Sequence, residues 1–577
     1  MRLVKFFIGL SPEKVKVLMR KNLWLLNLYS KSLQSSGLFY GLPSPAKLQK
    51  IYVKNIQKQS KLISQLCCET SDNVQLNVAF LLSGDVKLDV QGVREMQAMH
   101  QVQKLFVAGK SEHIKTLFAA IDDKPSKTVI KRFTSENVDH TLPLLLLRSG
   151  DYLHANAINV FFNALKSSDS KKLVLYCDCD ILDSKIGRHK GEFMPDWNPD
   201  LQLSSGYIKT GVLIADAQTL VEFWRFAQLN PSQELISLWF AHLYLRKIVV
   251  DVVHIPLILV HQSKTYDTNW LGLLPKMSGA SFEVLKGDHS EVVKLQWNRR
   301  EQLIVSLVIP TKNSKELVKA CIESILEKTK YPHYEILLVD NNSDEPQSLQ
   351  YFDELSTHPK IRLLKYPHPF NYSAINNFAV KHAHGEVIGL INNDIEVISP
   401  FWLDYMVGHV ARDDIGCVGA KLLYADDRVQ HAGVVLGYGG GAGHAHKYFP
   451  RDHPGYLNRL AATGNFSAVT AACLLVKKND YLAVGGLNEE ELTIAFNDVD
   501  FCLKVLELGR RNLYCAEAEL YHHESVSRGF EDTFEKQQRF ESELNYLKTN
   551  WASYIAHDPA YNPNLTLRRE NFSIKED

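Results

Sequence analysis

The sequence predicts an α/β protein with more than one domain and a helical extension at its N-terminus. Two stretches, 76–276 and 303–391, alternate short apolar runs with helical patterns, as in parallel sheets covered by helices. The chain has 577 residues, too many for one ordinary hydrophobic core. Its 45% hydrophobic and 23% charged residues are typical of a globular protein.

The extension, residues 1–75, is basic and helical in pattern. Residues 1–65 contain twelve Lys and Arg side chains and a single acid, Glu13. The Gly and Pro residues of 41–45 interrupt any single long helix. We favour a helical segment packed on the next domain. The alternative is an interfacial segment that contacts anionic lipid, because such segments need one apolar and one basic face.

We expect three units: the extension 1–75, an α/β domain over 76–277, and a second α/β domain over 303–577, with a polar linker at 278–302 between the domains. The expected strands of the first domain are 76–82, 142–147, 173–176, 212–214 and 249–255. Those of the second are 303–309, 335–339, 361–364 and 386–391, with helices at 314–328, 346–355 and 373–382.

Charge and cysteine usage exclude several classes of function. Lys plus Arg and Asp plus Glu are both 65, so no global field favours nucleic acid. The nine cysteines show no zinc spacing, which indicates a reducing compartment. No apolar run approaches the ~20 residues of a spanning helix, and the first residues lack a secretory pattern. We therefore expect a cytoplasmic protein, soluble or peripheral at the inner face of the membrane.

Polar side chains follow three predicted strands of the second domain at the point where each strand ends. The apolar run 385–391 ends in Asn392, Asn393 and Asp394, the first strand ends in 309–313, and the second in Asp340–Ser343. Parallel strands point the same way, so these groups meet at one sheet edge, where open α/β sheets bind ligands. Asp340–Ser343 is equally suited to turning the chain and capping a helix.

Two later segments add carboxylates and imidazoles. Asn497–Asp500 contains Asp498 and Asp500, and His522-His523 precedes Glu524 and Arg528. Together with the sheet edge they suggest a metal, a phosphate-bearing ligand and a general base. Asp498 also suits the N-cap of a helix over 499–508, a role compatible with that of a base.

These stretches together resemble the inverting family-2 glycosyltransferases, which have a GT-A (Rossmann-like) fold, across residues 303–570. They are most similar to bacterial enzymes of O-antigen, capsule or rhamnan synthesis, in which Asn-Asn-Asp replaces Asp-x-Asp. The resemblance implies a hexosyl- or deoxyhexosyltransferase that moves a sugar from a nucleoside-diphosphate sugar to a hydroxyl of a glycan or lipid-linked glycan. No nucleic-acid partner is expected.

The resemblance also implies roles for single residues. Asp498 is the expected base, and Asp394 with His522 the expected ligands of Mg²⁺ or Mn²⁺; the choice between His522 and His523 stays open. Because Asn392 and Asn393 carry no charge, metal affinity is expected to be modest. The residues expected at the nucleotide sugar are Pro310, Thr311, Asn313, Asp340, Asn342, Asn376, Asn393 and Arg528.

The first domain resembles a degenerate copy of the second. Leu144–Leu153 is similar to the metal-binding strand, but Arg148 and Gly150 stand where acids are expected. The base position falls near Glu234, with Ile236 where a second acid is expected. We expect this copy to have lost donor chemistry. Two alternatives are a bifunctional polymerase, in which both copies transfer sugars, and a non-catalytic glycan-binding or scaffolding protein.

Overall fold

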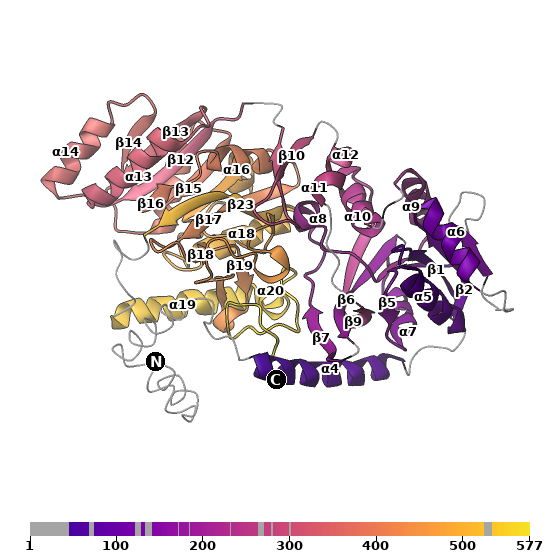
Figure 1. Ribbon diagram of the computed structural model, residues 1–577. Helices are drawn as coiled ribbons and strands as arrows, with labels where there is room; N and C mark the ends of the chain where they lie inside the picture. The colour runs from indigo at the N-terminus through magenta and orange to yellow at the C-terminus, as the bar shows by residue number, and fades with distance from the viewer. Residues whose placement is uncertain are drawn as a thin grey trace.

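The computed structural model contains two mixed α/β domains, each built on a large twisted sheet (Figure 1). It describes residues 45–67, 74–121, 129–132, 141–263, 270–278, 281–298, 302–523 and 533–576, apart from 171, 184, 231 and 233. The predictions for residues 1–44 and for Arg528 therefore lie outside the described residues.

The first domain has a sheet with the strand order β3-β2-β1-β4-β8-β6-β9-β5, and β7 pairs with β6. Its strands are β1 (Leu76–Leu81), β2 (Val102–Ala108), β3 (Val129–Arg132), β4 (Leu144–Arg148), β5 (Asp151–Leu153), β6 (Leu173–Asp183), β7 (Gly187–Glu192), β8 (Val212–Ile214) and β9 (Asp251–Gln262). Its helices are α5 (Val86–Ala98), α6 (Ser111–Ala120), α7 (Ala157–Lys166), α8 (Pro199–Ser205), α9 (Ala217–Leu229), α10 (Leu235–Leu245), α11 (Trp270–Leu273) and α12 (Pro275–Ser278).

The second domain has a sheet with the order β14-β13-β12-β15-β22-β17-β23-β16; β18 pairs with β17 and β21 with β23. Its strands are β12 (Val305–Thr311), β13 (Tyr334–Asp340), β14 (Ile361–Lys365), β15 (Val387–Ile391), β16 (Ile395–Val397), β17 (Ile415–Leu423), β18 (Val429–His431), β21 (Gly464–Asn465), β22 (Cys473–Lys477) and β23 (Arg511–His522), and β19 (Val434–Leu436) pairs with β20 (Ala442–His444). Its helices are α13 (Lys315–Lys328), α14 (Pro346–Leu355), α15 (Tyr372–His382), α16 (Trp402–Val410), α17 (Lys478–Ala483), α18 (Asn497–Glu507), α19 (Phe534–Asn550) and α20 (Ala552–Ala556), with 3-10 turns η3 (Tyr438–Gly440) and η4 (Tyr456–Asn458).

The two sheets repeat one topology strand for strand. In both, the first strand pairs in parallel with the second and fourth, at β1 and at β12. In both, the later strands alternate in the same way: β8 lies antiparallel to β4 and β6, as β22 does to β15 and β17. The final long strands, β9 and β23, run parallel to β6 and β17. The predicted tandem α/β fold is confirmed.

Local chemistry explains where several elements begin and end. Asn371 caps α15 by accepting a hydrogen bond from the Ala374 amide. Asn198 caps α8 in the same way, and Gly206 ends that helix in the left-handed conformation at φ 59°. The central strands β12, β13 and β15 are almost wholly buried, as expected for a sheet covered on both faces.

The stretch expected to be a linker contains a β-hairpin. Strands β10 (Phe282–Lys286) and β11 (Val293–Trp297) pair antiparallel, and Trp297 packs against Phe282 and against Arg412 after α16. Apolar residues alternate with polar ones along β11 and over Phe282–Val284 of β10, so the mean polarity of 278–302 concealed a pattern of period two.

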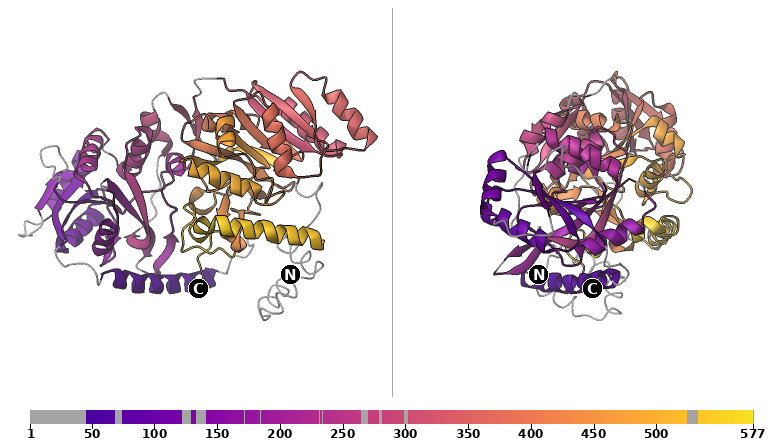
Figure 2. Two further views of the ribbon diagram at one scale, coloured as in Figure 1. Left: turned by 180° about the vertical axis from the view of Figure 1, so that it is seen from behind. Right: turned by 90° about the vertical axis from the view of Figure 1, so that its right-hand side faces the viewer.

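Helix α4 (Pro45–Cys67) and the C-terminal segment 558–576 join the two domains. Figures 1 and 2 show α4 as a straight helix along one edge of the molecule, beside the C-terminus. Tyr52 and Gln59 of α4 contact the first domain at Asp180 and Ile258. Asn562 of the C-terminal segment donates to Asp178, also in the first domain. The predicted packed helix is therefore present over 45–67.

A buried ionic network fixes the domains against each other. Asp200 of α8 lies 2.6 Å from Arg412 and 3.4 Å from Arg511, both in the second domain. Asp414 receives a hydrogen bond from Tyr244 at 2.7 Å. The two guanidinium groups hold the pKa of Asp200 well below its usual range, although burial opposes them. Breaking any of these partners would leave a buried charge uncompensated.

Among the described residues, no helix has the length and apolar character needed to cross a bilayer.

Candidate functional site

A cavity of about 1120 Å³ opens in the second domain, where β12 and β15 end and α18 begins. Its walls also include residues from β18, from the segment 470–472 before β22, and from α19. The predicted residues that line it are Pro310, Thr311, Asn313, Asn393, Asp394, Asp498 and His522. Polar groups that are far apart in the sequence thus face one space, as the strand-end pattern predicted.

The strand-end loops after β12 and β13 are tied together by Asn313. Its side-chain amide donates to Asp344 Oδ1 at 2.7 Å, and its Oδ1 accepts from the Asp344 and Glu345 amides. Its own amide donates to Ser343 Oγ at 2.7 Å. Asn313 has a φ of 53°, a left-handed conformation that Asn tolerates better than most residues. Its observed contacts build the rim of the cavity.

Three of the predicted donor-site residues do not line the cavity. Asp340 is buried at 6% exposure and accepts from the Ser343 amide at 2.9 Å. This bond stabilises the turn after β13, the structural alternative that the sequence allowed for Asp340–Ser343. Asn342 is exposed with a φ of 56°. Asn376 is fully buried in α15 and donates to the Tyr372 carbonyl of its own helix. The neighbouring Asn341, Tyr372 and Ile375 line the cavity instead.

Asp394 and His522 form a polar corner of the cavity. His522 Nε2 lies 3.1 Å from Asp394 Oδ1 and 3.2 Å from Asn392 Nδ2. β16 and β23 pair antiparallel with Ile395 opposite His522, and the His523 amide donates to the Asp394 carbonyl at 3.0 Å. His523 points elsewhere, to Glu396 at 3.4 Å. Of the two histidines, His522 is the one that meets Asp394.

Gln430 holds His522 from the opposite side. Gln430 Oε1 lies 2.6 Å from His522 Nδ1, and Gln430 Nε2 donates to the His522 carbonyl at 3.3 Å. No sequence pattern singled out Gln430, because it lies on the short strand β18, about 90 residues before His522. Its side chain lines the cavity.

Asp498 lies in the first turn of α18, half-buried at the cavity wall. Asp498 Oδ2 accepts from the Ala471 amide at 3.1 Å, and Oδ1 from the Val499 amide at 2.9 Å. Burial raises the pKa of Asp498, while these hydrogen bonds and one from Thr470 oppose the rise. The N-cap prediction is wrong: α18 starts at Asn497, and Phe496 takes the cap position at φ 58°.

Basic side chains line the remaining walls. Lys312 lies near the end of β12, Lys447 after β20, and Lys536 and Arg539 on α19. These cations were not singled out from the sequence, where Arg528 was preferred. Glu543 anchors α19 to the segment before α18, since it accepts hydrogen bonds from Thr493, Ile494 and Ala495. His444 also lines the cavity, and burial lowers its pKa to about 3, so its ring is neutral.

Comparison with known proteins decides the class of this domain. Residues 306–477 match the model of Glycosyl transferase family 2. This part of the chain belongs to that family. The match covers the strands that carry Thr311, Asp340 and Asp394, so the cavity described above is in part the cavity of a family-2 domain, and the predicted GT-A class is confirmed.

About three quarters of the chain is similar to parts of longer proteins. It is 40% identical to uncharacterized protein y4gI of Sinorhizobium fredii over 455 residues, 75% of this chain and 49% of that protein. It is 32% identical to O-antigen biosynthesis protein RfbC of Myxococcus xanthus over 429 residues, 70% of this chain and 32% of RfbC. The chain thus spans about half of the first relative and about a third of the second. A mannosyltransferase of Pyrobaculum calidifontis solved with GDP-Man and Mn²⁺ is 16% identical, with a TM-score of 0.33 over 45% of this chain and 72% of that one.

The repeated topology gives the positions of the first domain that correspond to Asp394, His522 and Asp498. Asp151 pairs with Gln262 as Ile395 pairs with His522, which puts Gly150 at the position of Asp394 and Gln262 at that of His522. The Ser263 amide donates to the Gly150 carbonyl, as the His523 amide does to Asp394. α10 starts at Leu235 and α18 at Asn497, so the counterpart of Asp498 is Ile236. The assignment of that position to Glu234 is corrected by this register.

The two buried acids of β6, Asp178 and Asp180, are engaged in internal contacts. Asp178 accepts from His254 at 2.8 Å and from the Met194 amide at 2.9 Å, besides Asn562. Asp180 contacts His261 at 2.6 Å, Arg188 at 2.7 Å and the Tyr52 hydroxyl. Burial alone would lower the pKa of His254, but Asp178 and Asp196 raise it to about 9. These carboxylates neutralise cations and cap donors within the core.

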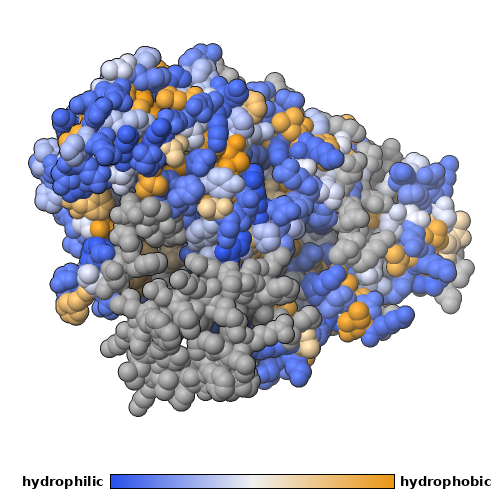
Figure 3. All heavy atoms as spheres, turned by 60° about the vertical axis from the view of Figure 1, so that its left-hand side comes forward, coloured by the Kyte–Doolittle hydropathy of each residue, from blue (hydrophilic) through white to orange (hydrophobic). Residues whose placement is uncertain are grey.

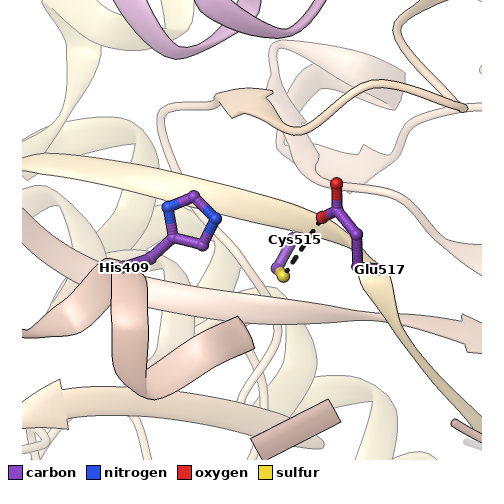
Figure 4. A group of neighbouring side chains, drawn as sticks. All are labelled: His409, Cys515 and Glu517. Carbon is purple, nitrogen blue, oxygen red and sulfur yellow. Dashed lines mark hydrogen bonds between the residues drawn. The ribbon is translucent and has the colours of Figure 1, made fainter. Parts of the chain in front are cut away.

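A further buried cluster in the family-2 half consists of His409, Cys515 and Glu517 (Figure 4). One donor atom of each lies within 4.8 Å of the others. Arg412 Nη1 lies 3.1 Å from His409 Nδ1, and a guanidinium can only donate, so Nδ1 accepts and the neutral ring carries its proton on Nε2. Burial lowers the pKa of His409 to about 3, and raises the pKa of Cys515 and Glu517. Protonated Nε2 offers no lone pair, so we assign no metal here.

Proposed function

We propose that the protein is an inverting glycosyltransferase with one donor site, in the second domain. It transfers a hexosyl or deoxyhexosyl group from a nucleoside-diphosphate sugar to a hydroxyl of a bacterial surface polysaccharide precursor of the O-antigen or capsule type. The observation that carries the proposal is the placement of the Asp394–His522 corner and of Asp498 on the walls of one cavity in a family-2 domain.

The Asp394–His522 corner fits a divalent cation, Mg²⁺ or Mn²⁺. Asp394 supplies a carboxylate oxygen at 5% exposure, and His522 directs Nε2 to the same place. Oxygen ligands suit both ions, and an imidazole nitrogen shifts the preference towards Mn²⁺. When bound, such an ion neutralises charge on the leaving diphosphate. Lys312, Lys447 and Arg539 supply further positive charge for phosphate oxygens.

Asp498 is the proposed general base, which accepts the proton of the attacking hydroxyl. A base must lie within hydrogen-bond reach of that hydroxyl, and its pKa works best when raised towards the working pH. Burial shifts the pKa of Asp498 in this direction. The two backbone amides at 3.1 and 2.9 Å hold the carboxylate in one orientation.

The donor and acceptor arrangement follows from the cavity walls. We assign the nucleotide sugar to the strand-end side, with Pro310, Thr311, Asn313 and Asn393 at its walls, and the acceptor to the side of Thr470, Phe496 and α19. Asn393 Nδ2 already donates to Thr311 Oγ1 at 3.0 Å, so these two groups form one polar surface. We assign no donor contact to Asp340, Asn342 and Asn376, because they do not line the cavity.

The first domain is proposed to be non-catalytic. Gly150, Gln262 and Ile236 stand at the positions of Asp394, His522 and Asp498, so it lacks a metal ligand and a base there.

A release assay for nucleoside diphosphate, with a panel of donor sugars and Mn²⁺, tests the proposal. Loss of all turnover in Asp498→Asn supports one active site. Turnover of a second linkage that survives would support the bifunctional polymerase, and no turnover by the wild type with any donor would support the scaffolding alternative.

We further propose that α4 contacts an anionic membrane surface. Its outer face carries a stripe of lysines spaced three or four residues apart, and α4 contains no acid. The stripe consists of Lys47, Lys50, Lys54, Lys58 and Lys61, all exposed. Val53 and Leu62 beside it are 43% and 46% exposed, whereas Tyr52 and Ile63 on the other face are buried. Lys47, at the start of the stripe, forms an ion pair with Glu576 at 3.6 Å.

Vesicle flotation tests this contact. Each lysine near an anionic bilayer contributes about 1 kcal/mol, about fivefold in affinity, so Lys50, Lys54 and Lys58 changed to Gln should weaken binding about 100-fold. The control changes Lys87, Lys115 and Lys166, exposed lysines of the first domain, to Gln. Outside the grey atoms, the face in Figure 3 is mainly hydrophilic with small apolar patches. Equal flotation of both triple variants would contradict a role for the stripe.

A further inference from the structure

We propose that strand β18 positions both halves of the reaction: Gln430 fixes the tautomer of His522 at the metal corner, and His431 fixes the segment that holds Asp498. This inference rests on the proposed function, in which Asp394 and His522 bind the cation and Asp498 is the base. Adjacent residues of a strand point to opposite sides, so one short strand reaches two separate partners.

The hydrogen bonds of Gln430 determine its orientation. Its Nε2 donates to the His522 carbonyl at 3.3 Å, so its Oε1 is the atom that faces His522 Nδ1 at 2.6 Å. If the amide were flipped, Gln430 Oε1 would face the His522 carbonyl oxygen, and two acceptors would meet. Oε1 only accepts, which requires the ring proton on Nδ1 and leaves the Nε2 lone pair directed away from Gln430.

The groups around Nε2 agree with this tautomer. Asn392 Nδ2 lies 3.2 Å from Nε2 and donates to it, while Asn392 Oδ1 accepts from the Tyr372 hydroxyl at 3.3 Å. Unprotonated Nε2 lies 3.1 Å from Asp394 Oδ1, so two electron-rich atoms approach each other. A cation between them would relieve this repulsion and would take the Nε2 lone pair in place of the Asn392 hydrogen bond. Gln430 thus prepares an imidazole for metal binding as an outer-shell partner does in known metal sites.

His431 makes the connection on the other side. It is fully buried, its Nδ1 donates to the Ala420 carbonyl at 2.8 Å, and its Nε2 accepts from the Thr470 amide at 3.2 Å. Burial holds the pKa of His431 well below its usual range, so the neutral ring can play both roles. Thr470 and the Ala471 amide in turn contact Asp498. His431 is therefore a positioning residue for the base.

Two kinds of variant separate these roles, with Mn²⁺ alone as the probe. Mn²⁺ titration of the full chain, followed by electron paramagnetic resonance, should show affinity reduced about 10–100-fold in Gln430→Ala. Gln430→Glu keeps an acceptor at His522 Nδ1 and should bind Mn²⁺ at least as well as the wild type. His431→Leu should leave Mn²⁺ affinity unchanged and lower kcat at saturating Mn²⁺. Gln350→Ala, an exposed glutamine of α14, is the control.

The result that overturns the inference is wild-type Mn²⁺ affinity in Gln430→Ala, or equal losses in Gln430→Ala and Gln430→Glu. Asp394→Asn distinguishes this failure from failure of the proposed function. If Asp394→Asn loses Mn²⁺ binding and Gln430→Ala does not, the metal site stands and only the role of Gln430 is wrong. If neither loses it, the metal site itself is wrong. Melting temperatures of all variants identify any that fail to fold; for these the decision passes to Gln430→Glu, which keeps the side-chain volume.

Discussion

Replacing Asp498 by Asn separates chemistry from stability. Asn keeps the size of the side chain but has a single acceptor oxygen, so one of the two amides now bonded to Asp498, from Ala471 and Val499, would face a donor. Leaving one buried donor unpaired costs about 1–3 kcal/mol of unfolding free energy. That loss is small against a typical stability of about 5–15 kcal/mol, so the variant should stay folded.

The expected loss of rate is much larger. General-base catalysis contributes about 10²–10⁴-fold, or about 3–5 kcal/mol of the activation barrier. Release of nucleoside diphosphate should therefore fall by that factor in kcat at saturating donor and Mn²⁺, measured well below the melting temperature. Binding of Mn²⁺ should not change, because Asp498 lies apart from the Asp394–His522 corner in the hydrogen-bond network.

The neighbouring acid gives a matched control. Asp500 is buried in the same helix turn, where it accepts from Trp551 Nε1 at 2.9 Å and pairs with Lys504 at 2.7 Å. Asp500→Asn should lower the melting temperature without a comparable loss of kcat. The assignment of the base would be refuted by a kcat for Asp498→Asn within about tenfold of the wild type, or by equal losses in both variants.

Four other results follow from the same contacts. Asp394→Asn should weaken Mn²⁺ binding and leave the melting temperature of the metal-free protein nearly unchanged; unaltered Mn²⁺ titration would argue against the corner. Because burial raises the pKa of Asp498, kcat should fall as the pH drops through that raised pKa. Because the pKa of Asp498 is higher in the folded than in the unfolded chain, the folded state takes up this proton more readily, so this group's contribution to stability should improve as the pH falls. Both effects should vanish in Asp498→Asn. Asp151→Asn should leave the glycosidic linkages of the product unchanged, since Asp151 accepts from the Arg148 amide in a domain without metal ligands. Loss of one linkage would support the bifunctional polymerase. Tyr52→Phe removes a donor from the buried Asp180, so it should cost about 1–3 kcal/mol, read as a lower melting temperature with unchanged donor KM.

Strand ends were the most predictable part of the site. Asp394 and Thr311 end buried apolar runs, and because parallel strands align, their side chains had to meet at one edge. Helix α14 matches its predicted bounds, since Pro346 opens it. The family resemblance pointed to Asp498, which lines the cavity, but the N-cap role predicted for it is wrong, because the left-handed Phe496 at the helix start leaves no mark in the sequence.

Partners that depend on tertiary contacts could not be predicted. Gln430 and His431 lie on a three-residue strand, and their importance follows only from its pairing with β17 beside β23. The contacts of Asp178 with Asn562, and of Asp180 with Tyr52, join segments separated by 384 and 128 residues. The hydrophobic periodicity of a sequence indicates which face of a helix or strand is buried, but it does not indicate which distant segment covers that face.

The most direct test of the central claim, one donor site in the second domain, is metal-dependent release of nucleoside diphosphate from a donor panel by the wild type, Asp498→Asn and Asp151→Asn. We predict that Mn²⁺ supports release by the wild type and by Asp151→Asn with the same product linkage, and that Asp498→Asn lowers the rate about 100-fold or more. A rate within about tenfold of the wild type in Asp498→Asn, or loss of release in a correctly folded Asp151→Asn, would contradict the account.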